Sequence, residues 1–315
     1  MCGARDWSRT LVVVLVAIVG LAVPSVSTAQ DASATTGILL LAHGGSSAWN
    51  QSVTAVADTV GKTQPVEVAF GMATRASMQA GIDRLIARGV TRIVAVPLFV
   101  SSHSSVITSI EFLLGQRAVA PPELEMFAGM DHGAPSAAAD PHAQHGARPA
   151  PAVPGSTPVT SRVPIRMVSA LNDHPVVADI LLARAMEISA DPARETIVIV
   201  AHGPMDDDEN REWLAAMKTL ADRMVREPRF RRIDYLTVRD DADEPVRAAA
   251  TADLRAVVTR ARDEGSRVLI VPLLLSYGGI EDGIRKRLDG LDYVMARRAL
   301  MPDDRLATWV IDSAK

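Results

Sequence analysis

Short apolar runs alternate with longer amphipathic segments along most of the chain. The segments Ile38–Ala42, Val66–Phe70 and Arg92–Val100 are rich in aliphatic residues and are bounded by glycine, proline or polar loops. Continuous apolar runs of this kind are typical of strands that are buried on both faces of a parallel sheet. Apolar positions at helical spacing follow over Ser46–Val60 and Met78–Arg88. The pattern predicts an α/β fold with right-handed crossovers.

A second series of the same elements follows in the C-terminal half. The sequence SRVLIVPLLLS at 266–276 repeats TRIVAVPLFVS at 91–101, and AHG at 201–203 repeats AHG at 42–44. Internal similarity of this kind predicts two βαβ modules that are related by duplication.

The N-terminal stretch has the composition of an export signal. Arg5 and Arg9 precede the apolar run Leu11–Val23, and Ser27-Thr28-Ala29 follows as a small-x-small cleavage site. A helical run of this length, rising about 1.5 Å per residue, is too short to cross a bilayer core of about 30 Å. We expect cleavage, export to the periplasm or the cell exterior, and no membrane span in the mature chain. The alternative is an uncleaved anchor.

Composition changes between residues 116 and 163, where Pro, Ala, Gly, Ser and His dominate. This stretch offers too little apolar surface to offset the entropy of ordering, so we expect a linker or a disordered insertion. Its His132, His142 and His145 either form a weak metal-collecting arm or have no role. A strand is expected at Ile165–Ser169, and Asp173-His174-Pro175 is expected to open a helix. The predicted organisation is a signal peptide (1–29), a first module (37–115), the linker (116–163), the last strand and helix of the first module (164–190) and a second module (191–315).

Charge and cysteine content limit the possible partners and metal ligands of the protein. The formal net charge of −4 and the lack of a long basic stripe argue against a nucleic-acid partner. The single cysteine, Cys2, precedes the apolar run of the signal, so the mature chain has neither a disulfide nor a thiolate ligand. A metal ion would be held by imidazole, carboxylate or water, which suits cobalt, nickel, iron or zinc.

Two histidines follow apolar strands of the first module. His43 comes directly after the first strand, and His103 lies in the serine-rich loop after the third. In the flavodoxin-like strand order these strands are neighbours, and ligands bind beyond their carboxyl ends. We therefore predict that the two imidazoles meet at one metal site, although each alone could be a loop residue with backbone partners. The second module has His202 at the position of His43 but Gly278 at that of His103.

These segments resemble the class II tetrapyrrole chelatases of the sirohydrochlorin cobaltochelatase group. The similar residues are Leu40-Leu41-Ala42-His43-Gly44, the sequence VPLFVSSH at 96–103, and Leu171-Asn172-Asp173-His174-Pro175. The resemblance covers about 37–115 and 164–315, and it implies two tandem chelatase-like, flavodoxin-like modules, each with a parallel sheet flanked by helices. In this family the two histidines of the N-terminal half bind the divalent metal and assist its insertion into the macrocycle. The resemblance implies this role for His43 and His103.

Further residues are candidates for contact with the metal or the macrocycle. Ser101 and Ser102 either leave room for a ligand or belong only to a helix-capping turn. Tyr277 and Glu281 could contact a bound macrocycle from the second module, or Glu281 could simply complement a helix N-terminus. His202 is either a third metal ligand or a relic of duplication.

We predict a chelatase-like enzyme that inserts a divalent metal, cobalt first and nickel or iron as alternatives, into a tetrapyrrole such as sirohydrochlorin. The metal is a substrate, and no organic cofactor is implied. Neutral imidazole suits the reaction, because it coordinates borderline metals and accepts protons near neutral pH. The alternative is an exported metal- or tetrapyrrole-binding protein without insertion activity, favoured by Met72 where the family often has an acidic residue. Internal duplication predicts a monomer, since the second copy can supply what a partner subunit otherwise would.

Overall fold

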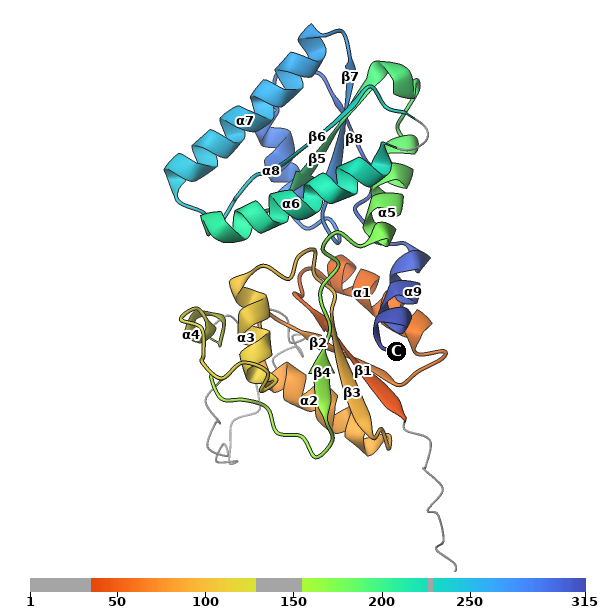
Figure 1. The fold of residues 1–315 in the computed structure, drawn as a ribbon, viewed down its shortest axis with the longest axis vertical. Helices are drawn as coiled ribbons and strands as arrows, with labels where there is room; N and C mark the ends of the chain where they lie inside the picture. Colours follow the sequence, from red (N-terminus) through yellow and green to blue (C-terminus); the bar gives the residue numbers. More distant parts are fainter. Residues whose placement is uncertain (1–34, 129–154, 226–228) are drawn as a thin grey trace, which may run out of the picture. The chain divides into compact units, whose positions relative to one another are not determined.

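The computed structural model describes residues 35–128, 155–225 and 229–315 (Figure 1). These residues form two four-stranded parallel sheets with helices on both faces of each. The strand order is β2-β1-β3-β4 in the first sheet and β6-β5-β7-β8 in the second. The predicted α/β class with two flavodoxin-like modules is confirmed, because the first and third strands of each module are neighbours.

The first sheet comes from the chain up to residue 167. Its strands are β1 (Thr36–Ala42), β2 (Val66–Phe70), β3 (Arg92–Pro97) and β4 (Ile165–Met167). The helices between and after them are α1 (Ser47–Val60), α2 (Arg75–Ala87), α3 (Ser105–Leu113), α4 (Leu124–Ala128) and α5 (Pro175–Met186).

The second sheet repeats this order of elements. Its strands are β5 (Glu195–Ala201), β6 (Arg232–Thr237), β7 (Arg267–Leu273) and β8 (Val294–Met295). Its helices are α6 (Asp207–Met224), α7 (Glu244–Asp263), α8 (Ile280–Arg287) and α9 (Asp304–Ser313), and a 3-10 turn at Pro192–Arg194 precedes β5. In the described parts of the chain, no helix combines the length and the apolar character that crossing a membrane requires.

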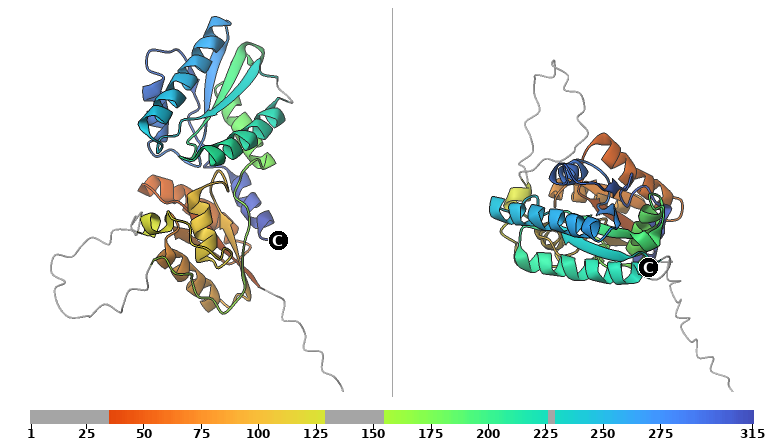
Figure 2. Two further views of the ribbon diagram at one scale, coloured as in Figure 1. Left: turned by 60° about the vertical axis from the view of Figure 1, so that its left-hand side comes forward. Right: turned by 90° about the horizontal axis from the view of Figure 1, so that it is seen from above.

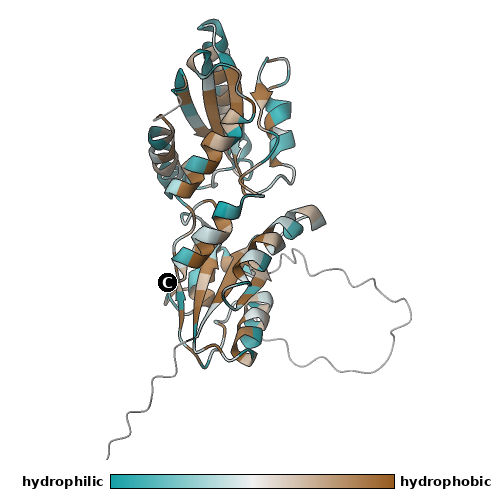
Figure 3. Ribbon diagram, turned by 90° about the vertical axis from the view of Figure 1, so that its right-hand side faces the viewer, coloured by the Kyte–Doolittle hydropathy of each residue, from teal (hydrophilic) through white to brown (hydrophobic). Residues whose placement is uncertain are grey.

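Successive residues of the central strands pack into different cores. In β1, Leu40 belongs to the core that includes α1, while Leu39 and Leu41 belong to the core with α2 and α3. In β5, Ile199 packs with α6 and Val200 packs with α7. Figure 3 shows the strands as the most hydrophobic part of the ribbon. Because both faces of each sheet are covered, the strands are apolar throughout, which produces the unbroken runs in the sequence.

The helix that follows the last strand of each sheet packs on the other sheet. Helix α5 follows β4 but packs against α6 and β7, and α9 follows β8 but packs against α1. Figures 1 and 2 show α9 beside α1. Residues 164–190, expected as the last strand and helix of the first module, are thus divided between the two sheets. Apolar spacing identifies a helix, but it does not reveal which sheet the apolar face will meet.

Helices α5 and α9 are thus exchanged between the two sheets, and Arg184 links them. It lies on α5, only 3% of its side chain is exposed, and its guanidinium contacts the segment that leads into α9. The acceptors there are the carbonyl oxygens of Ala299 (2.8 Å), Leu300 (3.0 Å) and Pro302 (2.9 Å) and the carboxylate of Asp303 (3.4 Å). A side chain on one exchanged helix therefore holds the start of the other.

The described flanks of the predicted linker, 116–163, are folded against the first module. Leu124 and Phe127 of α4 are buried in the core with α2 and α3. On the other flank, Gln79 of α2 makes two hydrogen bonds with the backbone of Thr160 (2.8 and 2.9 Å). The expectation of an unstructured stretch is wrong for these flanks, because a few apolar and polar anchors suffice to fix a proline-rich segment. The linker histidines and the predicted signal peptide lie outside the described residues.

Glu195, at the start of β5, is expected to contribute to the loss of folding stability at acid pH. Its side chain is 1% exposed and accepts hydrogen bonds from Ser189, from the amide of Ala190 and from Arg267. Burial raises the pKa of Glu195, but these hydrogen bonds together outweigh burial and leave the pKa below its ordinary value of 4.5. The carboxylate therefore stabilises the fold fully above pH 4.5, and this contribution is lost as the pH falls through the lowered pKa.

In Glu195→Gln, we expect the free energy of unfolding to fall less steeply between about pH 5 and pH 3 than in the wild type. Urea titrations at several pH values measure this slope. Glu212→Gln, an exposed position on α6, is the matched control and should follow the wild-type slope. An unchanged slope in Glu195→Gln would contradict the assignment.

Candidate metal site

The carboxyl edge of the first sheet carries both predicted metal-binding histidines. Strands β1 and β3 pair in parallel up to Leu41 and Pro97, so their C-terminal ends lie side by side. His43 directly follows β1, and His103 lies in the loop between β3 and α3. The predicted strand neighbours are observed, and the two histidines therefore belong to loops at the same edge.

The ring of His43 has a defined tautomer. Its Nδ1 donates to the carbonyl oxygen of Gly44 at 2.6 Å, since a carbonyl can only accept. In the neutral ring the lone pair then resides on Nε2, the nitrogen that can coordinate a metal. Metal-binding histidines commonly donate their second ring nitrogen in this way. Gly44 has φ +83°, a conformation that favours glycine and lets the chain turn directly after the strand.

His103 is exposed, but its backbone is anchored on both sides. Its amide donates to Oγ of Ser101 (3.1 Å), and its carbonyl accepts from the indole N–H of Trp213 on α6 (2.8 Å). The next residue, Ser104, begins α3 as the N-cap, where its Oγ accepts from the amide of Ile107 (3.4 Å). The imidazole is thus carried on a loop whose path is fixed by three side chains.

Ser101 and Ser102, which were predicted as possible substrate contacts, connect loops in the structure. Ser101 is buried beneath the amide of His103. Oγ of Ser102 accepts from the amide of Ala170 (2.9 Å) and from Nδ2 of Asn172 (3.0 Å), whose Oδ1 accepts from the Ser102 amide (2.7 Å). Asn172 joins the loops after β3 and β4, a role that sequence reasoning missed. Its only sequence signal was its place in the quoted family segment.

The predicted macrocycle contacts of the second module are engaged within that module. The hydroxyl of Tyr277 donates to the carbonyl of Ala296 (2.6 Å), and burial raises the pKa of Tyr277 to about 12. Glu281 is buried, and its Oε2 accepts from the amides of Gly278 (3.0 Å) and Gly279 (2.9 Å). Glu281 thereby satisfies backbone donors at the start of α8, which is a helix-capping contact.

His202 lies after β5, at the carboxyl edge of the second sheet. Its Nε2 is 3.5 Å from Oδ2 of Asp241. Among the residues that the structure describes, no three or more His, Cys, Asp or Glu side chains are grouped to hold a metal ion. The structure therefore does not bring His202 into such a group with His43 and His103.

Two tryptophans connect the histidine edge with the second module. The ring of Trp49 on α1 lies 6.3 Å from that of His43, centroid to centroid. A Cβ added at Gly278 would lie 3.4 Å from Cδ1 of Trp49, so the loop before α8 reaches this ring. Trp213 makes the other connection, to His103. Sequence reasoning assigned neither tryptophan a role, because the partners across the two modules, Gly278 for Trp49 and His103 for Trp213, are distant in the chain.

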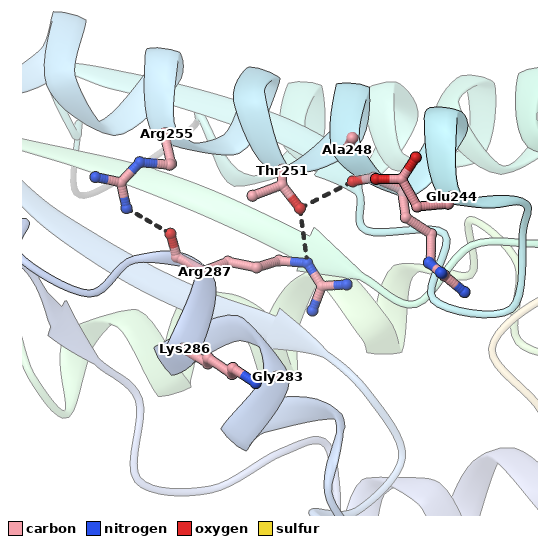
Figure 4. Close-up of a pocket in the computed structure, with 8 residues that line it drawn as sticks. Glu244, Ala248, Thr251, Arg255, Gly283, Lys286 and Arg287 are labelled. Atoms are coloured by element: carbon pink, nitrogen blue, oxygen red, sulfur yellow. Dashed lines mark hydrogen bonds between the residues drawn. The ribbon is translucent and has the colours of Figure 1, made fainter.

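An open hollow on the second module is separate from these histidines. It lies between α7 and α8 and has a basic lining that includes Arg247, Arg255, Lys286 and Arg287 (Figure 4). Two of these arginines join the helices, since Arg255 donates to the carbonyl of Arg287 (2.6 Å) and Arg287 donates to Oγ1 of Thr251 (3.1 Å). We assign the hollow no part in the metal site.

Comparisons with known proteins find similarities in sequence and in fold. A family model described as CbiX matches residues 37–188. The solved structure of SirB from Bacillus subtilis with Fe3+ has a TM-score of 0.59 at 15% sequence identity, over 89% of this chain and 94% of that chain. At this identity the likeness shows the fold.

A second structure is DR2241 from Deinococcus radiodurans, described as a multi-domain protein with structural similarity to chelatases. It has a TM-score of 0.49 at 17% identity, over 89% of this chain and 55% of that chain. No curated protein matches the chain in sequence. The match to the CbiX family model covers residues 37–188, just under half of the chain, and includes both His43 and His103.

Proposed function

We propose that this protein inserts a divalent metal ion into a tetrapyrrole such as sirohydrochlorin and that His43 and His103 hold the metal. The observation that carries the proposal is the position of both histidines at one carboxyl edge of a parallel sheet, within the segment that matches the CbiX family. Open α/β sheets bind their ligands at this edge.

The two imidazoles have different roles in metal insertion. His43, whose Nδ1–H is engaged by Gly44, offers the Nε2 lone pair to the ion. The exposed His103 coordinates the ion at first, and once a macrocycle nitrogen has displaced it from the ion, its released lone pair accepts a proton that a pyrrole nitrogen loses. Two protein ligands leave positions for water and then for macrocycle nitrogens, whereas a closed four-ligand site would hold the ion too tightly to pass it on.

Cobalt is the metal that we propose first, with iron and nickel as alternatives. Imidazole coordinates all three, and the SirB structure of similar fold contains Fe3+. We also propose that the protein is exported and acts as a monomer. The segment 1–29 supports export, and the contacts of Trp213 and Gly278 with the first module support a monomer, because one chain supplies both sides of the site.

A metal-insertion assay tests the proposed function. The chain from Gln30 onward is mixed with sirohydrochlorin and Co2+, Ni2+ or Fe2+, and the absorption spectrum of the macrocycle is followed. We expect the metal-free spectrum to be replaced by the metal-bound one at a rate proportional to protein concentration and above the rate without protein. A rate equal to that without protein for every metal would contradict insertion.

A second candidate function is a metal- or tetrapyrrole-binding protein without insertion activity. It is favoured by Met72, which packs against the core of the first module and offers no carboxylate beside the site. The same assay separates the two functions, because a binder retains the metal or the macrocycle without accelerating the spectral change.

A further inference from the structure

Trp213 lies where the second module meets the loop that carries His103. Its indole N–H donates to the carbonyl oxygen of His103 at 2.8 Å, across 110 positions of sequence. The indole nitrogen can only donate, so this bond ties the ring to one backbone oxygen. The helix beneath it is firmly placed, since Met217 and Leu220 on α6 are buried in the main core.

Both peptide groups of His103 are therefore fixed by side chains, while its imidazole is exposed. The amide is held from within the first module by Ser101, and the carbonyl is held from the second module by Trp213. A metal ligand on a loop needs such support, because a productive site keeps its ligands within about 0.5 Å of the required position. Trp213 is partly buried against the main core, and its N–H selects one acceptor, the carbonyl oxygen of His103.

We propose that Trp213 is a positioning residue for His103, through which the second module sets the metal affinity of a centre built in the first. This inference rests on the proposed function of His103. Without the indole N–H, the loop samples arrangements in which the imidazole does not reach the ion. The apparent affinity then falls by the fraction of molecules in which the loop is correctly placed.

The test uses Trp213→Phe in the full mature chain, because phenylalanine keeps an aromatic ring and lacks the N–H. We expect the Kd for Ni2+, measured by calorimetry or chelator competition, to rise about threefold to tenfold, the effect of losing one neutral hydrogen bond. Thermal unfolding monitors whether the fold itself has changed.

A double-mutant cycle separates positioning from a general structural role. His103→Ala removes the imidazole and keeps the backbone carbonyl that Trp213 binds. In the His103→Ala background we therefore expect Trp213→Phe to leave the residual Ni2+ affinity unchanged.

Two results would overturn the positioning role while leaving the proposed function intact. One is a wild-type Kd in Trp213→Phe, and the other is an equal loss of affinity with and without the His103 imidazole. A third result, wild-type Ni2+ affinity in His103→Ala alone, would instead refute the proposed metal site, and the positioning role with it.

Discussion

Replacing Arg184 by methionine is expected to lower the free energy of unfolding by about 3–5 kcal/mol. Methionine keeps the apolar stem but removes a guanidinium that is almost fully buried. The carbonyl oxygens of Ala299, Leu300 and Pro302 lose their donor, and each buried polar group left unpaired costs about 1–3 kcal/mol. Urea titration of wild type and variant at neutral pH measures the loss.

Arg305→Met is the matched control for burial. Arg305 binds the same carboxylate, Asp303, through its Nη2 at 2.8 Å, but 41% of its side chain is exposed. Exposed ion pairs contribute about 0–1 kcal/mol, so we expect a loss in that range. Equal losses in the two variants would show that the stabilisation comes from charge at Asp303 and not from the buried contacts of Arg184.

Alanine at either His43 or His103 is expected to lower the rate of metal insertion by at least about 100-fold. Each substitution removes one of the two proposed metal ligands, and a single remaining imidazole cannot both hold the ion and assist proton removal. Both positions are on loops after strands, so the fold should survive, which circular dichroism and thermal unfolding check. The insertion rate with sirohydrochlorin and Co2+ measures the effect, and a wild-type rate in either variant would remove that histidine from the site.

His174→Ala provides the control for loss of an imidazole elsewhere. Nδ1 of His174 accepts from the amide of Val176 (3.2 Å) at the start of α5, so the variant loses a helix cap. We expect a loss of about 0.5–2 kcal/mol in stability and no loss of insertion per folded molecule. The parallel variant His202→Ala decides between a third ligand, for which insertion falls, and a relic of duplication, for which it does not.

Local sequence signals were sufficient to predict the strands and helices and the carboxyl edge of the first sheet, which carries the candidate metal site. Strand β2 has the predicted bounds Val66–Phe70. His174 caps α5 where the sequence predicted a helix start. These features depend on residues close together in the chain, whose preferences act directly on the local backbone.

Features that depend on distant partners could not be predicted in this way. The strand predicted over Arg92–Val100 ends at Pro97, and the carbonyls of Phe99 and Val100 accept instead from the amides of Leu171 (3.1 Å) and Asn172 (2.9 Å) in the loop after β4. The partner of Trp213 is a backbone carbonyl, which has no sequence signature. The exchange of α5 and α9 is equally invisible, since an apolar helix face is compatible with either sheet.

Because of that exchange, the first module is fully covered only after α9 has been synthesised. Helix α1 is translated early, but α9, the helix that packs on it, occupies residues 304–313. Until those residues leave the ribosome, the nascent chain presents an uncovered apolar surface of the kind that chaperones bind. For a polypeptide that we propose to be exported, this late covering delays stable packing of the first module until α9 has been synthesised.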